Sequence, residues 1–156
     1  YETREVIPDE LITKIQNQGT FNQGFMTTEL LAAALLDMEL HNLTDTENLN
    51  VVAFEKETMD KLGLIPEIAP RYRATYFSHI IGGYAAGYYS YLWAEVLDTD
   101  AFEAFKEHGV FDKNTADSFR KNILEKGGTE DPMTLYRGFR GADPSLEPLL
   151  KNRGLK

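Results

Sequence analysis

The sequence predicts an all-α fold, with one helical domain spanning residues 1–156. Apolar side chains recur at the three- and four-residue spacing of helices along most of the chain. Proline stands where the expected helices begin and glycine where they end, which is the order that helix termini favour. No segment alternates apolar and polar residues beside a hairpin dipeptide such as Asn-Gly, so the pattern requires no strand. A chain of 156 residues with 42% apolar side chains is large enough to build a core.

Two helices are expected at the N-terminal end. The first begins near Pro8, where acidic residues follow in the first turn, and it stops at Gly19. The second is capped by Thr27 or Thr28 and continues to about Leu40. Apolar side chains nearly encircle the axis of this second helix, which is typical of a helix in the interior of a larger body.

Residues typical of helix ends predict a further helix from Asn50 to Leu62 that stops at Gly63. Pro66 and Pro70 then force an irregular connection. A long helix is then expected to hold the Gly/Tyr segment, 82–97, and to continue to about residue 107. Three shorter helices complete the prediction: one capped by Asn114 or Thr115 that ends at Gly127-Gly128, one from Asp131-Pro132 to Gly141, and one from Ser145 to Lys151.

Charge and composition exclude several classes of function. Asp and Glu outnumber Lys and Arg by 25 to 16, a net charge of −9, and such a surface repels the phosphates of nucleic acids. The absence of cysteine excludes disulfides, thiol catalysis and cysteine metal sites. No apolar run is long enough to span a membrane, and no secretory signal is visible. We therefore expect a cytoplasmic protein without nucleic-acid or membrane partners.

Histidine is too sparse for a self-contained zinc site. The chain has three histidines, His41, His79 and His108, and none has a second histidine at helical ligand spacing. We expect His41 to be structural or to lie exposed at the end of its helix, and His108, beside Gly109, to act as a cation at a helix C-terminus. The chain begins at Tyr1 rather than methionine, which leads us to expect a piece of a longer protein.

Tyrosines concentrate between positions 72 and 91, where six of the eight occur. On a helical wheel, Tyr84, Tyr88 and Tyr91 fall on one narrow face. A phenol keeps its proton at neutral pH and can donate it to an oxyanion, and aligned donors of this kind are among the larger catalytic contributions. Gly82 and Gly83, just before this face, allow the backbone to approach a ligand or to act as a hinge.

A structural interpretation of the same residues stays open. Gly83 and Gly87 are four apart, which also suits two closely packed helices, and buried tyrosines are common in cores. A lone histidine such as His79 is more often a hydrogen-bonded structural residue than a catalytic one. Arg71 and Arg73 are surface charges by default. Because they lie close in sequence to the tyrosine segment, they are also candidates to bind a substrate carboxylate.

Several segments of the sequence resemble those of a known family. Residues 77–93, FSHIIGGYAAGYYSYLW, closely resemble the F-x-H-x-x-G-G-Y-x-A-x-Y-Y-x-Y-L-W block of the thimet oligopeptidase family of zinc metallopeptidases. The segments 25–38, 72–77 and 139–155 also match the family. They are most similar to its bacterial peptidyl-dipeptidase branch, with oligopeptidase A as a near relative. The resemblance covers the whole chain but only the C-terminal part of a family member.

This resemblance implies a role for each residue of the block. Tyr84 and Tyr91 correspond to the phenols that bind the scissile carbonyl and stabilise its oxyanion, His79 to a histidine near the scissile bond, and Tyr88 to a peptide contact. The family holds zinc with a His-Glu-x-x-His helix and a downstream glutamate, and the sequence contains neither. The implied fold is the C-terminal, multi-helix part of a larger zincin-type oligopeptidase.

Two functional hypotheses follow. In the first, the chain is the C-terminal part of a zinc peptidase that hydrolyses short peptides and releases C-terminal dipeptides; alone it binds no zinc and is inactive. Its partners are then short peptides and the missing N-terminal part, and surface left uncovered favours self-association. In the second, the chain is an autonomous helical module whose tyrosine face binds a peptide or protein without chemistry.

Overall fold

The computed structural model describes residues 2–156, so Tyr1 lies outside the described residues. Helices joined by turns and irregular segments make up the described part of the chain, and no strand occurs there, which confirms the all-α prediction. The chain divides into two compact units, residues 1–91 and residues 92–156. The single domain expected over residues 1–156 stays a prediction. No helix of the described residues is long and apolar enough to cross a membrane.

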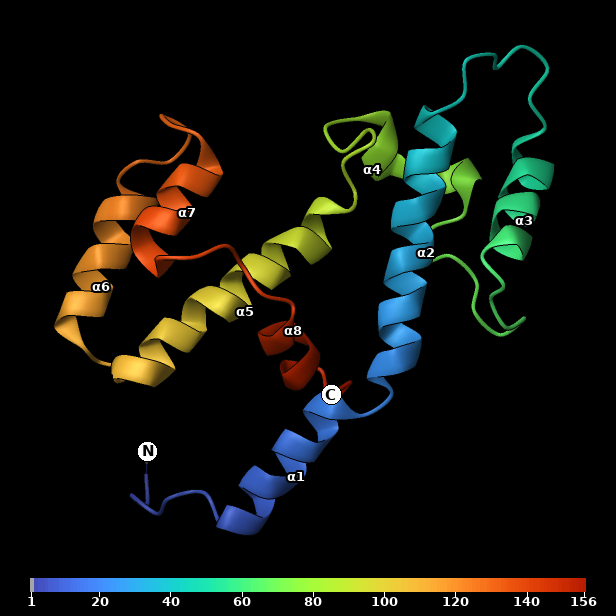
Figure 1. Cartoon of the computed structure of the whole chain (residues 1–156). Coiled ribbons are helices and arrows are strands. Elements are labelled where there is room, and N and C mark those ends of the chain that lie inside the picture. Colours follow the sequence, from blue (N-terminus) through green and yellow to red (C-terminus); the bar gives the residue numbers. More distant parts are fainter. Residues whose placement is uncertain (1) are drawn as a thin grey trace. The chain divides into compact units, whose positions relative to one another are not determined.

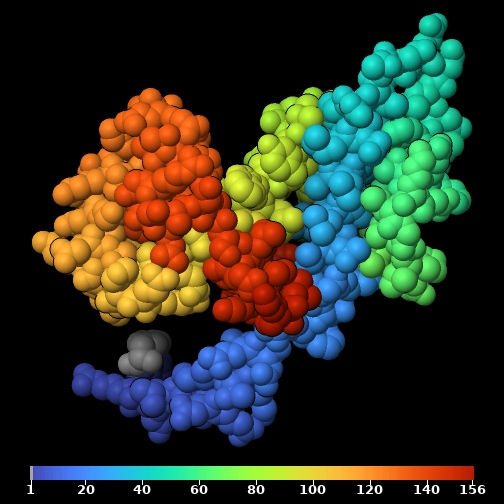
Figure 2. Space-filling view, in the orientation of Figure 1, coloured from blue at the N-terminus to red at the C-terminus, as the bar shows by residue number. Residues whose placement is uncertain are grey.

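The first unit is organised around α2. In Figure 1, α1 leads into α2, and in Figure 2 the segment that carries α3 lies against α2. The elements of this unit are α1 (Asp9–Thr20), α2 (Gln23–His41), α3 (Val51–Lys61), the 3-10 turn η1 (Ala74–Tyr76), α4 (Ser78–Ile81) and the first residues of α5 (Ser90–His108).

The expected boundaries of the first two helices need correction. α1 continues through Gly19 to Thr20, and α2 begins at Gln23, before either threonine that was expected to cap it. The Thr28 hydroxyl donates to the Gly24 carbonyl oxygen at 2.8 Å. A threonine hydroxyl can bond back to the carbonyl four residues earlier as readily as it caps, so Thr28 lies inside the helix.

One side of α2 forms the core of the first unit. Ala33 and Leu36 are fully buried, while Leu31, Leu35 and Met38 on the same helix are exposed. The helix is therefore interior along one side only within this unit. The core cluster joins α2 to the segment that follows η1, and it consists of Ala33, Ala34, Phe77, Ile80 and Tyr88.

The prediction for α3 is confirmed. The Asn50 side chain caps the helix by accepting the Ala53 N–H at 3.0 Å, and Leu62 follows the last helical residue. Gly63 then adopts a φ of +65°, a left-handed conformation that glycine reaches without strain. The segment that contains Pro66 and Pro70 is irregular, as expected.

The long helix expected through the Gly/Tyr segment is wrong. α4 ends at Ile81, residues 82–89 form turns, and α5 begins only at Ser90. Glycine is a poor helix former, and the backbone N–H groups of Ala86 and Tyr88 are donated to the side chain of Asp37 instead of to helical carbonyls. A tertiary contact from α2 thus overrides the helical spacing of the tyrosines.

The second unit contains the rest of α5 together with α6 (Lys113–Phe119), the π-helical turn η2 (Arg120–Leu124), α7 (Pro132–Arg140) and α8 (Glu147–Asn152). Asp112, rather than Asn114 or Thr115, caps α6 by accepting the Thr115 N–H at 2.7 Å. The expected cap, proline start and glycine stop of α7 are confirmed, and the last helix is confirmed to within two residues.

A polar network, buried at Asp100 and exposed at Glu107, holds α7 to α5 in the second unit. Asp100 on α5 is 4% exposed and accepts the Tyr136 hydroxyl at 2.5 Å. Arg140 donates to both carboxylate oxygens of Glu107, at 2.9 and 2.8 Å. Bidentate pairs of this kind fix geometry as well as adding energy, so the network sets how the two helices face one another.

Candidate active site

The aromatic rings of the first unit gather around His79. Its ring centroid lies 4.7 Å from Tyr72, 5.3 Å from Tyr88, 5.9 Å from Tyr84 and 6.2 Å from Tyr91. These residues come from three places: the segment before η1, the turns at 82–89 and the first turn of α5. Here the His79 cluster means His79 with these four tyrosines.

The three phenols predicted to act together do lie together. The rings of Tyr84 and Tyr91 are stacked, with centroids 5.1 Å apart and planes inclined by 12°, and Tyr88 meets Tyr91 edge-on at 5.2 Å. They reach this arrangement through a folded turn and not through the continuous helix that the sequence predicted. The expected proximity of the rings is therefore correct, although the expected backbone is wrong.

The exposure of the phenols separates them into two kinds. Tyr84 is 39% exposed and Tyr91 is 43% exposed, so a ligand can reach both. Interaction with the Tyr84 hydroxyl raises the pKa of Tyr91. A phenol is protonated at neutral pH even at its ordinary pKa of about 10, so this shift leaves Tyr91 a donor. Tyr88 is 3% exposed and belongs to the core cluster, so its ring is a packing element as well as part of the His79 cluster.

His79 has an unused polar atom. Its Nδ1 is buried and has no hydrogen-bond partner among the described residues. Buried polar atoms are nearly always paired, and exceptions occur where a ligand, water or ion completes the site. The default interpretation of His79, a structural histidine satisfied by internal hydrogen bonds, does not account for this atom.

The two arginines occupy different environments. Arg73 donates its Nε to the carboxylate of Glu55, a residue only 3% exposed, so part of its guanidinium is engaged in a structural ion pair. Arg71 is exposed. Burial raises the pKa of the Tyr88 phenol, and the nearby charge of Arg71 opposes that shift. Arg71 is thus close enough to the cluster to interact with it electrostatically, and its predicted carboxylate contact stays a prediction.

Gly82 and Gly83 lie in open turns beside His79. A side chain added at Gly83 would meet nothing within 4 Å, and one at Gly82 would meet only backbone oxygens at 4.0 Å. Of the two glycines whose spacing suited close helix packing, Gly83 therefore makes no such contact within the first unit, and Gly87 approaches only the backbone of Tyr84 in its own turn. The exposed backbone leaves room for a ligand, and the predicted substrate contact stays a prediction.

No metal centre can be assembled from the described residues. Among residues 2–156, no group of three or more His, Cys, Asp or Glu side chains lies close enough together to hold a metal ion. A resident zinc ion therefore does not fit the residues at hand. The prediction that this chain binds no zinc by itself stays a prediction.

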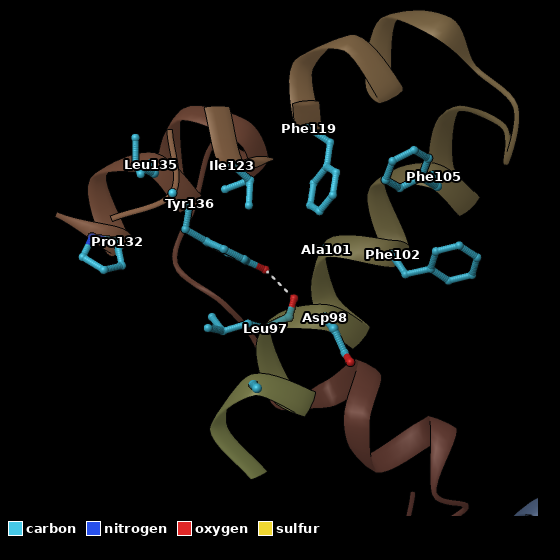
Figure 3. Close-up of a pocket in the computed structure, with 12 residues that line it drawn as sticks. Leu97, Asp98, Ala101, Phe102, Phe105, Phe119, Ile123, Pro132, Leu135 and Tyr136 are labelled. Atoms are coloured by element: carbon cyan, nitrogen blue, oxygen red, sulfur yellow. Dashed lines mark hydrogen bonds between the residues drawn. The ribbon is translucent and has the colours of Figure 1, made fainter. Parts of the chain in front are cut away.

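A mainly apolar cavity lies in the second unit and contains none of the predicted site residues. Figure 3 shows Phe105, Phe119 and Ile123 facing this cavity, with the Tyr136 hydroxyl directed to the Leu97 carbonyl oxygen at 3.4 Å. Its walls are almost wholly apolar, so it offers little to bind or activate a polar group.

Sequence reasoning missed two residues of the site, one inside the His79 cluster and one that binds its turn. Sequence reasoning assigned Tyr72 no role beyond the tyrosine-rich stretch and the family-like segment 72–77, yet its ring is the nearest tyrosine ring to His79. Asp37 was read as part of an apolar helix, yet it is fully buried and binds the turn that carries Tyr88. The available signal was the acid itself, because a carboxylate on an otherwise apolar helix face needs a buried partner.

Comparison with known proteins assigns the family. Residues 1–155 match the sequence profile of Peptidase family M3. The chain belongs to this family. It is 44% identical over 162 residues to the dipeptidyl carboxypeptidase of Escherichia coli (strain K12), a match that covers 99% of the chain and 23% of that relative. It is 40% identical over 157 residues to oligopeptidase A of Haemophilus influenzae, covering 99% of the chain and 23% of that relative.

A more distant member of the family shows the same coverage. The chain is 31% identical over 160 residues to saccharolysin of Saccharomyces cerevisiae, covering 100% of the chain and 22% of that protein. The chain thus spans about a quarter of the length of these relatives. The suspected resemblance to oligopeptidases and peptidyl-dipeptidases is confirmed, and peptidase is the activity class that the family supports.

Proposed function

We propose that this chain supplies one wall of the active-site cleft of a zinc peptidase that hydrolyses short peptides. Tyr84 and Tyr91 stabilise the tetrahedral oxyanion, and His79 contacts the substrate beside the scissile bond. The observation that carries the proposal is the stacked, half-exposed pair of Tyr84 and Tyr91 next to the unpaired Nδ1 of His79, in a member of Peptidase family M3.

The chemistry of the phenols follows from their protonation. The pKa of a phenol is about 10, so both hydroxyls are neutral donors at neutral pH. When the trigonal carbonyl becomes tetrahedral, its oxygen gains negative charge, and a fixed donor binds this oxygen more strongly than it binds the ground state. One such donor contributes on the order of 3 kcal/mol to transition-state stabilisation.

The metal is assigned to the rest of the longer protein. In this family's chemistry zinc supplies a Lewis acid and a nucleophilic water, and the described residues of this chain form no site for it. The part played by this chain is consequently to bind and orient the peptide and to donate hydrogen bonds to the carbonyl oxygen. The isolated chain is then inactive.

Substrate and partners complete the proposal. The substrates are short peptides, and release of a C-terminal dipeptide requires an anchor for its carboxylate, for which the exposed Arg71 is the candidate cation. The dipeptidyl carboxypeptidase relative supports this mode by its name. The missing N-terminal part of the enzyme is the protein partner. Exposed side chains such as Ile81 (84%) and Phe111 (98%) are apolar surface available to that partner or to self-association. A cytoplasmic location belongs to the same proposal.

The first test compares three tyrosine variants in the longer protein that contains this chain. Tyr91→Phe and Tyr84→Phe each remove a hydroxyl from the stacked pair, and each should lower kcat about a hundredfold or more with little change in KM. Tyr89→Phe is the matched control, because Tyr89 lies in the same turn, is 52% exposed and lies outside the cluster. Near-wild-type kcat for both Tyr84→Phe and Tyr91→Phe would overturn the proposal.

A second test uses the 156-residue chain alone. It should cleave no short peptide and bind no stoichiometric zinc. Chelator-sensitive hydrolysis by the purified chain would contradict the assignment of the zinc site to the rest of the longer protein. Peptide binding by the longer protein without any cleavage would instead support the alternative of a non-catalytic binding module.

A further inference from the structure

Asp37 is a fully buried acid with an unusual set of partners. It lies on the core side of α2, and its relative exposure is 0%. Its Oδ1 accepts the Ala86 N–H at 3.0 Å, and its Oδ2 accepts the Tyr88 N–H at 2.9 Å. His41, one helical turn along, places Nδ1 2.9 Å from Oδ1. Both oxygens of the carboxylate are therefore used, and two of the bonds reach residues about fifty positions away in the sequence.

The turn that Asp37 binds contains a residue in an unfavourable backbone conformation. Ala86 has a φ of +52°, a left-handed conformation that costs a residue with a Cβ about 1–2 kcal/mol. Such conformations persist where the surroundings determine them, and they are common at functional sites. Within the turn, the Gly87 N–H bonds the Tyr84 carbonyl oxygen at 2.9 Å. The hydrogen bond from the Ala86 N–H to Asp37 adds a constraint from outside the turn, and the bond from Tyr88 fixes the next part of it.

We propose that Asp37 is a positioning residue for the tyrosines of the His79 cluster. By binding the backbone of Ala86 and Tyr88, its carboxylate fixes the turn between Tyr84 and α5, so that the Tyr84 ring stacks on Tyr91. The proposal rests on the proposed function for its kinetic consequence, but its structural claim can be tested without any activity.

Glu55 provides a matched comparison within the same unit. It is also buried, at 3% exposure, and its Oε2 accepts the Ala74 N–H at 2.7 Å while Arg73 binds the other oxygen. It therefore anchors η1, on the other side of His79 in the sequence, and it touches neither Ala86 nor Tyr88. Asp37→Asn and Glu55→Gln each neutralise one buried acid, so a general loss of stability should appear in both variants.

Hydrogen exchange on the 156-residue chain separates the two anchors. Asp37→Asn replaces one acceptor oxygen with an NH2 group that faces a backbone donor, so exchange at Ala86 and Tyr88 should accelerate at least about tenfold relative to the amides of α3. Glu55→Gln should accelerate Ala74 and leave Ala86 and Tyr88 unchanged. Equal protection of Ala86 and Tyr88 in wild type and Asp37→Asn would overturn the proposal.

The wild-type chain keeps the claim testable if Asp37→Asn does not fold. The amides of Ala86 and Tyr88 should then exchange markedly more slowly than that of Tyr89, their neighbour in the same turn. Rapid exchange at both positions in the wild type would overturn the proposal, since a buried carboxylate that holds them must protect them.

Kinetic measurements on the longer protein test whether the position of the turn matters for catalysis. Asp37→Asn should lower kcat at least about tenfold with KM changed much less, whereas Glu55→Gln should have the smaller effect on kcat. If Tyr91→Phe lowers kcat and Asp37→Asn does not, the positioning role is wrong and the proposed function stands. If neither variant affects kcat while Asp37→Asn still releases the two amides, the proposed function is wrong, and Asp37 holds the turn without serving catalysis.

Discussion

The two units use the same residue types, tyrosine and buried aspartate, in opposite ways. In the second unit Tyr136 gives its hydroxyl to Asp100, and burial together with this bond raises the pKa of Tyr136. In the first unit the carboxylate of Asp37 instead accepts the backbone N–H groups of Ala86 and Tyr88. A carboxylate that binds the backbone leaves the phenols available for a ligand, whereas one that binds the phenol makes it structural.

The largest effect is expected when a hydroxyl of the stacked pair is removed. Tyr84→Phe in the longer protein should lower kcat about a hundredfold and leave the melting temperature nearly unchanged, because the hydroxyl is half-exposed and acts mainly in the transition state. Steady-state kinetics and thermal melting of the same preparation measure both effects. A large loss of stability with unchanged kcat would assign Tyr84 to the structural class.

Tyr136→Phe should show the reverse behaviour. It leaves Asp100 buried without its hydroxyl donor, which should reduce the free energy of unfolding by about 1–3 kcal/mol. Urea unfolding of the 156-residue chain measures the loss. In the longer protein kcat should not change, and a fall in kcat comparable to that of Tyr84→Phe would contradict the comparison.

Ala86→Gly tests whether the left-handed backbone at position 86 limits the stability of the turn. Glycine adopts a φ near +52° without steric cost and keeps the N–H that Asp37 accepts, although it loses more entropy on folding. We expect stability to rise by up to about 1 kcal/mol, measured by urea unfolding. A loss of more than about 1 kcal/mol would mean that the left-handed conformation is not what limits this turn.

The smallest expected effect concerns acid stability in the second unit. A hydrogen bond from the Thr134 N–H lowers the pKa of Asp131 below its ordinary value of 3.8. A carboxyl with a lowered pKa stabilises the fold above its ordinary value and loses that contribution as the pH falls through the folded-state pKa. Asp131→Asn keeps a capping side chain without the titration. Its melting temperature should match wild type near neutral pH and fall less between about pH 5 and about pH 2.

Local signals predicted local structure well. Asn50 and Gly63 delimit α3, and Asp131 and Gly141 delimit α7, because a capping side chain or a left-handed glycine acts within a few residues of its own position. The start of α2 and the turns at 82–89 were not predictable in this way. The latter depend on Asp37, whose two backbone contacts lie about fifty residues along the chain.

The candidate site was predictable in its members but not in its geometry. The tyrosine spacing and the resemblance selected Tyr84, Tyr91 and His79, and the rings do gather. The helical wheel predicted their proximity from a continuous helix, whereas turns at residues 82–89 bring the rings together. Asp37 could be suspected as an acid on an apolar helix, but its partners near residue 87 and the place of the Tyr72 ring follow only from the fold.

The affinity of the longer protein for a phosphinic peptide, which mimics the tetrahedral anion, tests the central claim most directly. If the two stacked phenols bind the oxyanion, Tyr91→Phe should weaken phosphinic peptide binding about as much as it lowers kcat/KM, while the affinity for substrate peptide and the behaviour of Tyr89→Phe stay near wild type. Equal phosphinic peptide affinity in wild type and Tyr91→Phe would contradict the assignment of these hydroxyls to the transition state.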